Sequence, residues 1–151
     1  MRKIETIKAG KNFAAVSVGK VNEIIEHELP MGPDFIIQGK VFVGQAVGAT
    51  GSELSFQTLV PGQDSDFLHT HKTHEELYII LKGEGQYQVD GEIVPVGEGT
   101  IVRVSPDGKR ALKNTGDENL TMLCIQYKAN AFTEADSPMT DGVILQEELK
   151  W

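Results

Sequence analysis

Cysteine is almost absent from this chain of 151 residues, which contains only Cys124. One cysteine excludes an intrachain disulfide, and its apolar surroundings indicate a small buried hydrophobe rather than a nucleophile or a metal ligand. Long apolar runs are absent too, because the longest, Leu77 to Leu81, is far shorter than the about 20 residues that span a bilayer. No apolar signal core follows Arg2 and Lys3. We therefore expect a cytoplasmic protein without a membrane partner.

Positive charge is also scarce. Fourteen Lys and Arg residues stand against 22 Asp and Glu residues, which gives a formal net charge of −8. The densest basic group consists of Lys109, Arg110 and Lys113, and three residues do not make a basic patch. Binding to phosphates requires clustered Lys and Arg, so the composition argues against a nucleic-acid partner.

What the chain does contain is typical of one globular domain. Hydrophobic residues make up 40% and charged residues 24% of the sequence, and this balance favours a folded core over disorder. Sixteen glycines spread along the chain indicate many turns and favour short strands over long helices. No internal repeat or linker divides the sequence.

The periodicity of apolar residues divides the chain into three parts. Residues 1–34 form an N-terminal extension, in which helical spacing over 21–29 predicts a short helix that Pro30 ends. Residues 35–130 alternate with a period of two, and Asp90-Gly91 is a strong hairpin signal, so we expect a small all-β sandwich or barrel. Residues 131–151 form a polar tail with a possible helical turn near 134–141.

Metal-ligating residue types come together in one stretch. His69 and His71 are two residues apart, so on an extended strand their side chains point to the same face. Glu76 follows after a polar turn and can fold back beside them. Two imidazoles and one carboxylate suit a first-row transition metal and leave coordination positions open for chemistry.

These residues, with the glycines around them, resemble the first motif of the cupin family. The first motif is represented by Gly62, His69, His71, Glu76 and Gly83. The second motif is represented by Gly99, Pro106, Gly108 and Asn114. The spacing departs from the family in one extra residue between Gly62 and His69, and Pro106 is displaced by one. The resemblance covers residues 40 to 128 and implies a double-stranded β-helix, or jelly roll, with a site inside the barrel.

The resemblance also places Arg110 where the family has its fourth metal ligand, a histidine. Arginine has no lone pair to give, so it cannot replace that ligand. Three arrangements stay open. Arg110 binds an anionic group of a ligand that also reaches the metal, or swings to solvent, or pairs with Glu75 or Glu76 and replaces the metal.

Strand alternation assigns expected positions to the neighbouring side chains. Tyr78 shares a face with Glu76, so it either lines the pocket and binds a ligand or belongs to the core. Glu75 has the opposite parity and should face outward. His74 in the polar turn and His27 on the predicted helix should be exposed to solvent.

The function that we predict is that of a metal-binding cupin that holds a small anionic organic molecule in the barrel. The metal is a divalent Fe, Mn, Ni or Zn ion held by His69, His71 and Glu76, and Arg110 and Tyr78 bind the ligand. If the protein is an enzyme, isomerase, lyase or dioxygenase chemistry is expected, but no catalytic acid or base can be assigned. The alternatives are a non-catalytic binding or sensor module without metal, and an interaction or storage protein whose barrel forms a homodimer.

Overall fold

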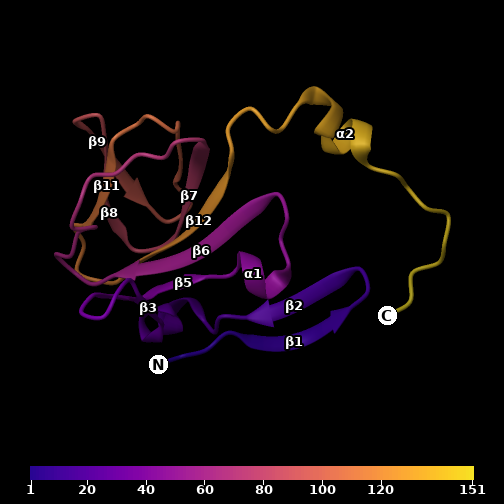
Figure 1. The fold of residues 1–151 in the computed structure, drawn as a ribbon, viewed down its shortest axis with the longest axis horizontal. Coiled ribbons are helices and arrows are strands. Elements are labelled where there is room, and N and C mark those ends of the chain that lie inside the picture. The colour runs from indigo at the N-terminus through magenta and orange to yellow at the C-terminus, as the bar shows by residue number, and fades with distance from the viewer.

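The computed structural model describes all 151 residues and shows a barrel made of two antiparallel sheets (Figure 1). The larger sheet has five strands in the order β10-β7-β12-β6-β5. Its members are β5 (Lys40–Phe42), β6 (Ser52–Leu59), β7 (His74–Lys82), β10 (Ile101–Val104) and β12 (Leu120–Lys128). The smaller sheet has the order β11-β8-β9 and consists of β8 (Glu84–Val89), β9 (Glu92–Gly97) and β11 (Arg110–Asn114).

The hydrophobic core lies between these two sheets. Along β7 the buried residues Glu76, Tyr78 and Ile80 alternate with less buried ones, as the period of two predicts. Residues from both sheets fill the interior. They are Leu59, Tyr78, Ile80, Tyr87, Val96, Val104, Leu112, Leu120, Met122 and Cys124. The predicted all-β, double-stranded β-helix is confirmed, and so is the buried position of Cys124.

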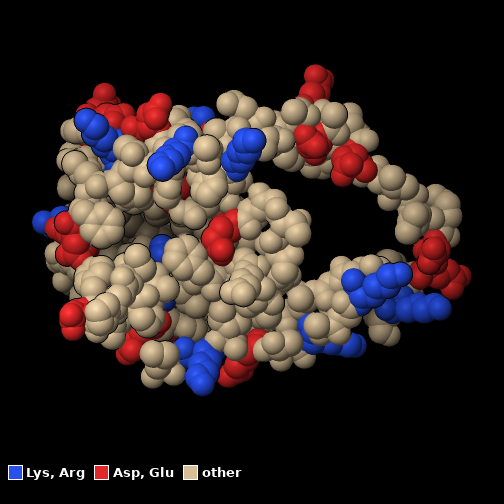
Figure 2. Space-filling model, in the orientation of Figure 1, with Lys and Arg blue, Asp and Glu red and all other residues tan.

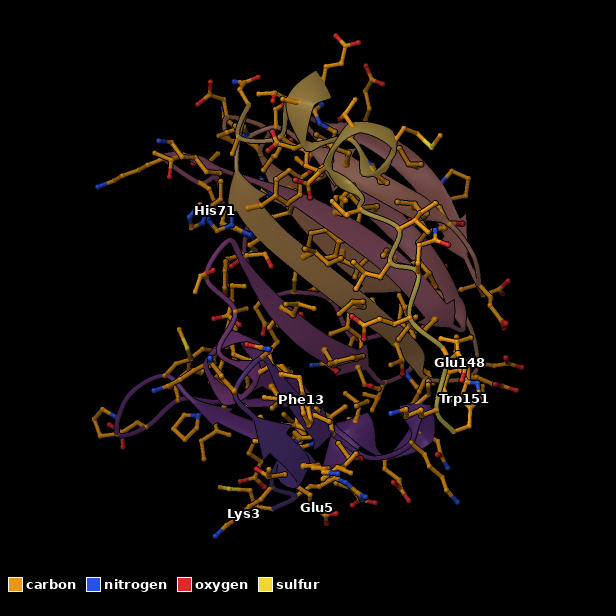
Figure 3. All side chains as sticks on the ribbon, turned by 90° about the vertical axis from the view of Figure 1, so that its right-hand side faces the viewer. Lys3, Glu5, Phe13, His71, Glu148 and Trp151 are labelled. Atoms are coloured by element: carbon orange, nitrogen blue, oxygen red, sulfur yellow. The ribbon has the colours of Figure 1, made fainter.

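The N-terminal extension contains more strand than the sequence indicates. The strands β1 (Glu5–Gly10) and β2 (Phe13–Ser17) form a separate hairpin, and β3 (Glu28–Pro30) pairs with β4 (Ile36–Gln38). Figure 3 shows Phe13 on the hairpin below the barrel, away from His71. Another short helix, α1 (Gly44–Val47), connects β5 to β6.

The helix predicted over 21–29 is a 3-10 helix, η1 (Val21–Glu26), and ends earlier than expected. The next residue, His27, is extended, and the chain then enters the pairing of β3 with β4. Strand pairing therefore takes the residues that would have continued the helix. The prediction that His27 is solvated was wrong, because it is buried and its Nε2 lies 2.8 Å from the Val18 carbonyl oxygen.

The C-terminal part leaves the barrel after β12. A helical turn lies where the sequence predicts one, as η2 (Glu134–Asp136) and α2 (Pro138–Asp141). The last ten residues contain no regular element and arc away from the barrel (Figure 1). None of the helices has the length and apolar character needed to cross a membrane.

Two motif glycines allow a matched test of the fold. Gly83 and Gly99 both have φ of +83°, a backbone conformation that strains L-residues, but their surroundings differ. A Cβ on Gly83 would collide with the backbone of Asn119, whereas a Cβ on Gly99 meets nothing within 4 Å. We expect Gly99→Ala to lower the free energy of unfolding by about 1 kcal/mol, and Gly83→Ala by at least about 1 kcal/mol more. Urea unfolding measures both, and equal losses would contradict the close approach of β12 to Gly83.

Candidate metal and ligand site

The two histidines lie on the loop between β6 and β7, which the neighbouring strand holds in place. The backbone N–H of His69 donates to the carbonyl of Arg110, and the N–H of Arg110 donates back to His69, at 3.2 and 3.1 Å. The N–H of His71 donates to the carbonyl of Pro106 at 3.0 Å. These bonds fix an otherwise irregular loop to β11 and the turn before it, so both imidazoles face the barrel interior.

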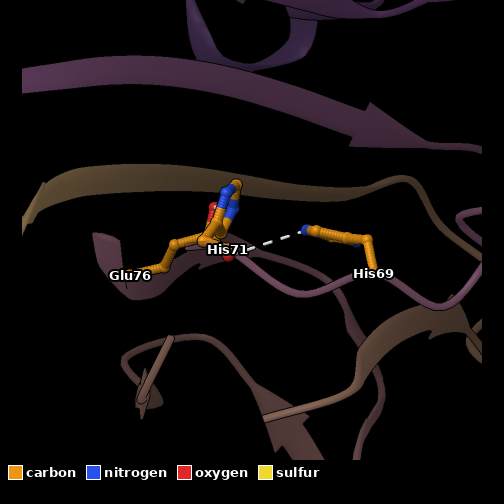
Figure 4. A group of neighbouring side chains, drawn as sticks. All are labelled: His69, His71 and Glu76. Atoms are coloured by element: carbon orange, nitrogen blue, oxygen red, sulfur yellow. Dashed lines mark ion pairs between the residues drawn. The ribbon is translucent and has the colours of Figure 1, made fainter. Parts of the chain in front are cut away.

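Strand β7 supplies the carboxylate of the site. Glu76 is 1% exposed, and it faces both histidines (Figure 4). Its Oε1 lies 3.1 Å from His71 Nε2, and its Oε2 lies 3.8 Å from His69 Nε2. The predicted convergence of His69, His71 and Glu76 is therefore present, with one ligand atom from each residue within 4.8 Å of the others.

Further donors surround the Glu76 carboxylate. Gln126 Nε2 on β12 donates to Oε1 at 2.7 Å, and the Tyr78 hydroxyl donates to Oε2 at 3.3 Å. Arg110 Nε on β11 lies 3.1 Å from Oε2, and the Cys124 thiol lies 3.5 Å from Oε1. Both carboxylate oxygens are thus stabilised in the ionised state.

The ionisation of the site follows from these contacts. Burial alone would raise the pKa of Glu76, but the contacts with His69 and Gln126 and the charges of His71 and Arg110 outweigh it and hold the pKa far below its ordinary value. Burial lowers the pKa of His71, although Glu76 opposes this shift. At neutral pH the site therefore contains a carboxylate and a neutral His71 imidazole, which are the protonation states that a metal requires.

Arg110 is buried, and four of its five N–H groups face acceptors of the protein. It is 0% exposed, so the arrangement in which it swings to solvent is excluded. Its terminal nitrogens donate to the carbonyls of Gly108 at 2.9 Å, Pro106 at 3.1 Å and Ser105 at 3.2 Å, while Nε faces Glu76. Of the three arrangements expected for Arg110, the structure contains its pairing with Glu76. Arg110 also lines the cavity next to the site.

The donor set fits a transition metal. Two ligand atoms that each lie about 2.1 Å from one ion are about 3 to 3.5 Å apart in tetrahedral or octahedral geometry. The 3.1 and 3.8 Å separations between histidine nitrogens and Glu76 oxygens are close to this spacing. His71 Nε2 is moreover buried without a hydrogen bond, since it faces Glu76 out of alignment. Its lone pair is free to bind an ion.

The other side chains singled out in the sequence lie as follows. Tyr78 is 7% exposed, borders the cavity and belongs to the core cluster. Its binding of a ligand stays a prediction. Glu75 lies on the opposite face of β7 and pairs with Arg103 at 2.7 Å. His74 is exposed and stays outside the cluster of metal-ligating residues, as expected.

A cavity of about 180 Å³ extends from the site to the open end of the barrel. Figure 2 shows the molecule hollowed on the left half of the face in view. Gln126 lines the cavity as well, and only the register of β12 against β7, which pairs Gln126 with Glu76, brings it to the site. Lys40 is another lining residue, and no pattern in the sequence predicts its place there.

Comparisons with known proteins agree with this geometry. The family model described as Cupin domain matches residues 55–126. A crystal structure of a cupin protein from Bacteroides fragilis is 34% identical, with a TM-score of 0.67, and the match covers 79% of this chain and 96% of that one.

Two curated proteins match a shorter part. An uncharacterized protein of Methanocaldococcus jannaschii is 34% identical over 71 residues, which are 47% of this chain and 57% of the relative. The oxalate-binding protein of Thermotoga maritima is 32% identical over 66 residues, 44% of this chain and 54% of the relative. The match thus spans only a little over half the length of these curated relatives.

Removing the guanidinium of Arg110 should leave the Glu76 carboxylate buried without its main counter-charge. We expect Arg110→Met to lower the free energy of unfolding of metal-free protein by about 3 to 5 kcal/mol. Arg103→Met is the matched control, because Arg103 pairs with Glu75 at the surface and an exposed pair contributes at most about 1 kcal/mol. Equal small losses in urea unfolding would show that the charge of Glu76 does not depend on Arg110.

The low pKa of Glu76 predicts how stability depends on pH. The unfolded chain takes up the proton near the ordinary pKa of about 4.3, whereas the folded protein resists it. The stabilisation from Glu76 is therefore complete above about pH 5 and is lost as the pH falls below that value, by up to about 1.4 kcal/mol per pH unit. Metal-free Glu76→Gln should show a shallower decline of unfolding free energy between pH 5 and 3. An unchanged slope would contradict the assignment.

Proposed function

Since the chain belongs to the cupin family, we propose that it binds a divalent transition metal ion through His69, His71 and Glu76, and a small anionic organic molecule beside it. The observation that carries this proposal is the convergence of the three side chains, two of which, His69 and Glu76, also line the cavity. The buried Nε2 of His71, which makes no hydrogen bond, supports it further. The ion belongs to the Fe, Mn, Ni and Zn group, because two nitrogen donors and one carboxylate suit these metals.

The surrounding residues have separate roles in this proposal. His69 and His71 bind the ion as neutral imidazoles, and Glu76 brings the negative charge that compensates it. The bound ion supplies a Lewis acid that polarises an oxygen of the ligand. Tyr78 faces the ligand with its ring, since it lines the cavity. Arg110 acts on the ligand through Glu76, because its terminal nitrogens already donate to backbone carbonyls.

The ligand class is supported by one relative and by the charge of the site. The relative named as an oxalate-binding protein shares 32% identity over 66 residues. An anion also suits a cavity that Arg110 and Lys40 line together with the single buried carboxylate of Glu76. We propose that the ligand shares with oxalate a carboxylate group. The residues that line the cavity determine which other groups of a ligand fit.

A metal-free binding module is the second candidate, and one observation favours it. Arg110 Nε lies 3.1 Å from Glu76 Oε2 and already compensates the buried carboxylate without an ion. In this case the cavity binds the anionic molecule as a sensor or carrier, and the two histidines donate hydrogen bonds to it.

The proposed setting is that of a cytoplasmic homodimer. The one cysteine is free and buried, which is typical of cytosolic proteins. Apolar side chains are exposed on the N-terminal hairpin, with Ile7 69% and Phe13 52% accessible, and a second copy of the chain would remove them from water.

Metal analysis of protein purified without a histidine tag tests the leading proposal. We expect about one equivalent of Fe, Mn, Ni or Zn in the wild type, and loss of this metal in His69→Ala/His71→Ala, because one carboxylate alone binds these ions weakly. His74→Ala is the matched control, since His74 lies close to His71 but outside the cluster. Its metal content should equal that of the wild type.

Two results of this measurement would overturn the metal proposal. One is less than one equivalent after dialysis against each of the four metals. The other is a metal content that the double substitution leaves unchanged. Either result, combined with carboxylate binding by metal-free protein in calorimetry, would establish the binding module instead.

A further inference from the structure

Lys40 is a cationic side chain that lines the cavity, and the proposed function gives it no contact with the ligand. It lies on β5, where it pairs in register with Gln57 of β6, and both residues line the cavity. Its ammonium donates to Gln57 Oε1 at 3.1 Å and lies 5.3 Å from the centre of the Phe42 ring. Lys40 therefore faces the cavity from the sheet edge that lies across it from Arg110 on β11.

The hydrogen-bonding capacity of Lys40 is mostly free. A lysine ammonium has three donors, and only the one to Gln57 is used by the protein. No carboxylate lies within ion-pair distance of it, whereas Arg110 contacts Glu76 and three backbone carbonyls. Lys40 has two unused donors, whereas Arg110, beside Nε that faces Glu76, keeps one unused N–H on Nη2.

The charges around the cavity favour an anion at this place. Its ionisable lining residues are Lys40, Asp64, Asp66, His69, Glu76 and Arg110. Asp64 and Asp66 are exposed at the opening, so solvent screens them. In the interior, Arg110 and Glu76 compensate each other, which leaves the charge of Lys40 unpaired.

The walls of the cavity indicate the rest of the ligand. Between the polar interior and the opening, the lining is apolar and includes Leu29, Met31, Phe35, Ile37, Phe42 and Phe67. Met31, Phe35 and Phe67 are each about half exposed, at 58%, 46% and 53%. A ligand that covers them removes apolar area from water. A cavity of about 150 Å³ holds a benzene ring, so the 180 Å³ here accommodate one ring or branched chain.

We propose that Lys40 binds the carboxylate of the ligand, and that the ligand is a small carboxylic acid with an apolar, ring-sized body directed toward the opening. This inference rests on the proposed function, since it concerns the same cavity, but it makes a separate claim about Lys40 and about the ligand's body. Oxalate, which has no apolar part, would leave the apolar walls uncovered.

The ionisation of Lys40 agrees with this geometry. Burial lowers its pKa, and the negative charge of Glu76 offsets the effect only in part. A carboxylate beside the ammonium would restore the favourable environment that it lacks.

Calorimetric titration with phenylacetate and its neutral isostere phenylacetamide tests the role of Lys40. We expect the wild type to bind phenylacetate at least about tenfold more tightly than phenylacetamide, because a hydrogen-bonded charge pair is formed only by the acid. Lys40→Met keeps the length and apolar stem of the side chain and should remove this preference, with phenylacetamide affinity unchanged. Lys40→Arg keeps the charge and should retain the preference. Lys8→Met, an exposed residue of β1, is the matched control and should behave as the wild type.

The outcomes separate this inference from the proposed metal site. Metal content is measured on the same samples and should not change in Lys40→Met, whatever the binding result. A preference for phenylacetate that survives in Lys40→Met would overturn the role of Lys40. If the wild type binds oxalate more tightly than phenylacetate, or does not bind phenylacetate, the inference that the ligand has an apolar body is wrong. If the wild type contains no metal but still prefers phenylacetate over phenylacetamide, the metal proposal is wrong and the proposed role of Lys40 stands.

Discussion

The buried charge of Glu76 is the constraint on which the rest of the structure depends. A carboxylate that is almost completely removed from water can remain ionised only with close partners, and here they come from separate parts of the chain: the β6–β7 loop, β11 and β12. The loop is adjacent in sequence to β7, which carries Glu76, and β11 is close to β12, but β8, β9 and β10 separate these two groups. The barrel must therefore close correctly for the carboxylate to be satisfied, and the satisfied carboxylate in turn holds the loop and both sheets together.

The two cations that line the cavity, Arg110 and Lys40, differ in what they bind. Arg110 offers a planar fork, which suits several fixed acceptors at once, and the protein uses it on the turn before β11. Lys40 has a compact charge on a flexible side chain at the sheet edge, which suits the acceptor group of a reversibly bound ligand. One cation thus shapes the site and the other stays available. The polar interior and apolar opening then give the cavity a direction along which an amphipathic molecule can enter.

The sequence predicted the fold and the convergence of His69, His71 and Glu76 because both have local signals. Period-two alternation and the Asp90-Gly91 turn indicate a β-barrel, and the spacing of His69, His71 and Glu76 predicts a shared face. The N-terminal hairpin was not predicted from the sequence. All residues of β1 are exposed, so it lacks the alternation of buried and exposed positions that a half-buried strand has. The prediction that His27 is exposed to solvent was wrong because its burial depends on contacts outside its own segment, such as that with Val18. Lys40 and Gln126 reach the site through strand register, and the hydrogen-bond partners of Arg110 are backbone carbonyls, which carry no residue-specific signal.

The engagement of Arg110 with the turn at residues 105–108 bears on how such a centre arises. A histidine at this position would restore a fourth ligand, but as a ligand it keeps a single N–H and cannot replace donors to Ser105, Pro106 and Gly108. The turn would then contain unsatisfied carbonyls in a buried place, which costs stability. Replacing Arg110 by a histidine therefore needs a rebuilt turn as well as a new side chain. In protein engineering, position 110 and the turn at residues 105–108 have to be changed together.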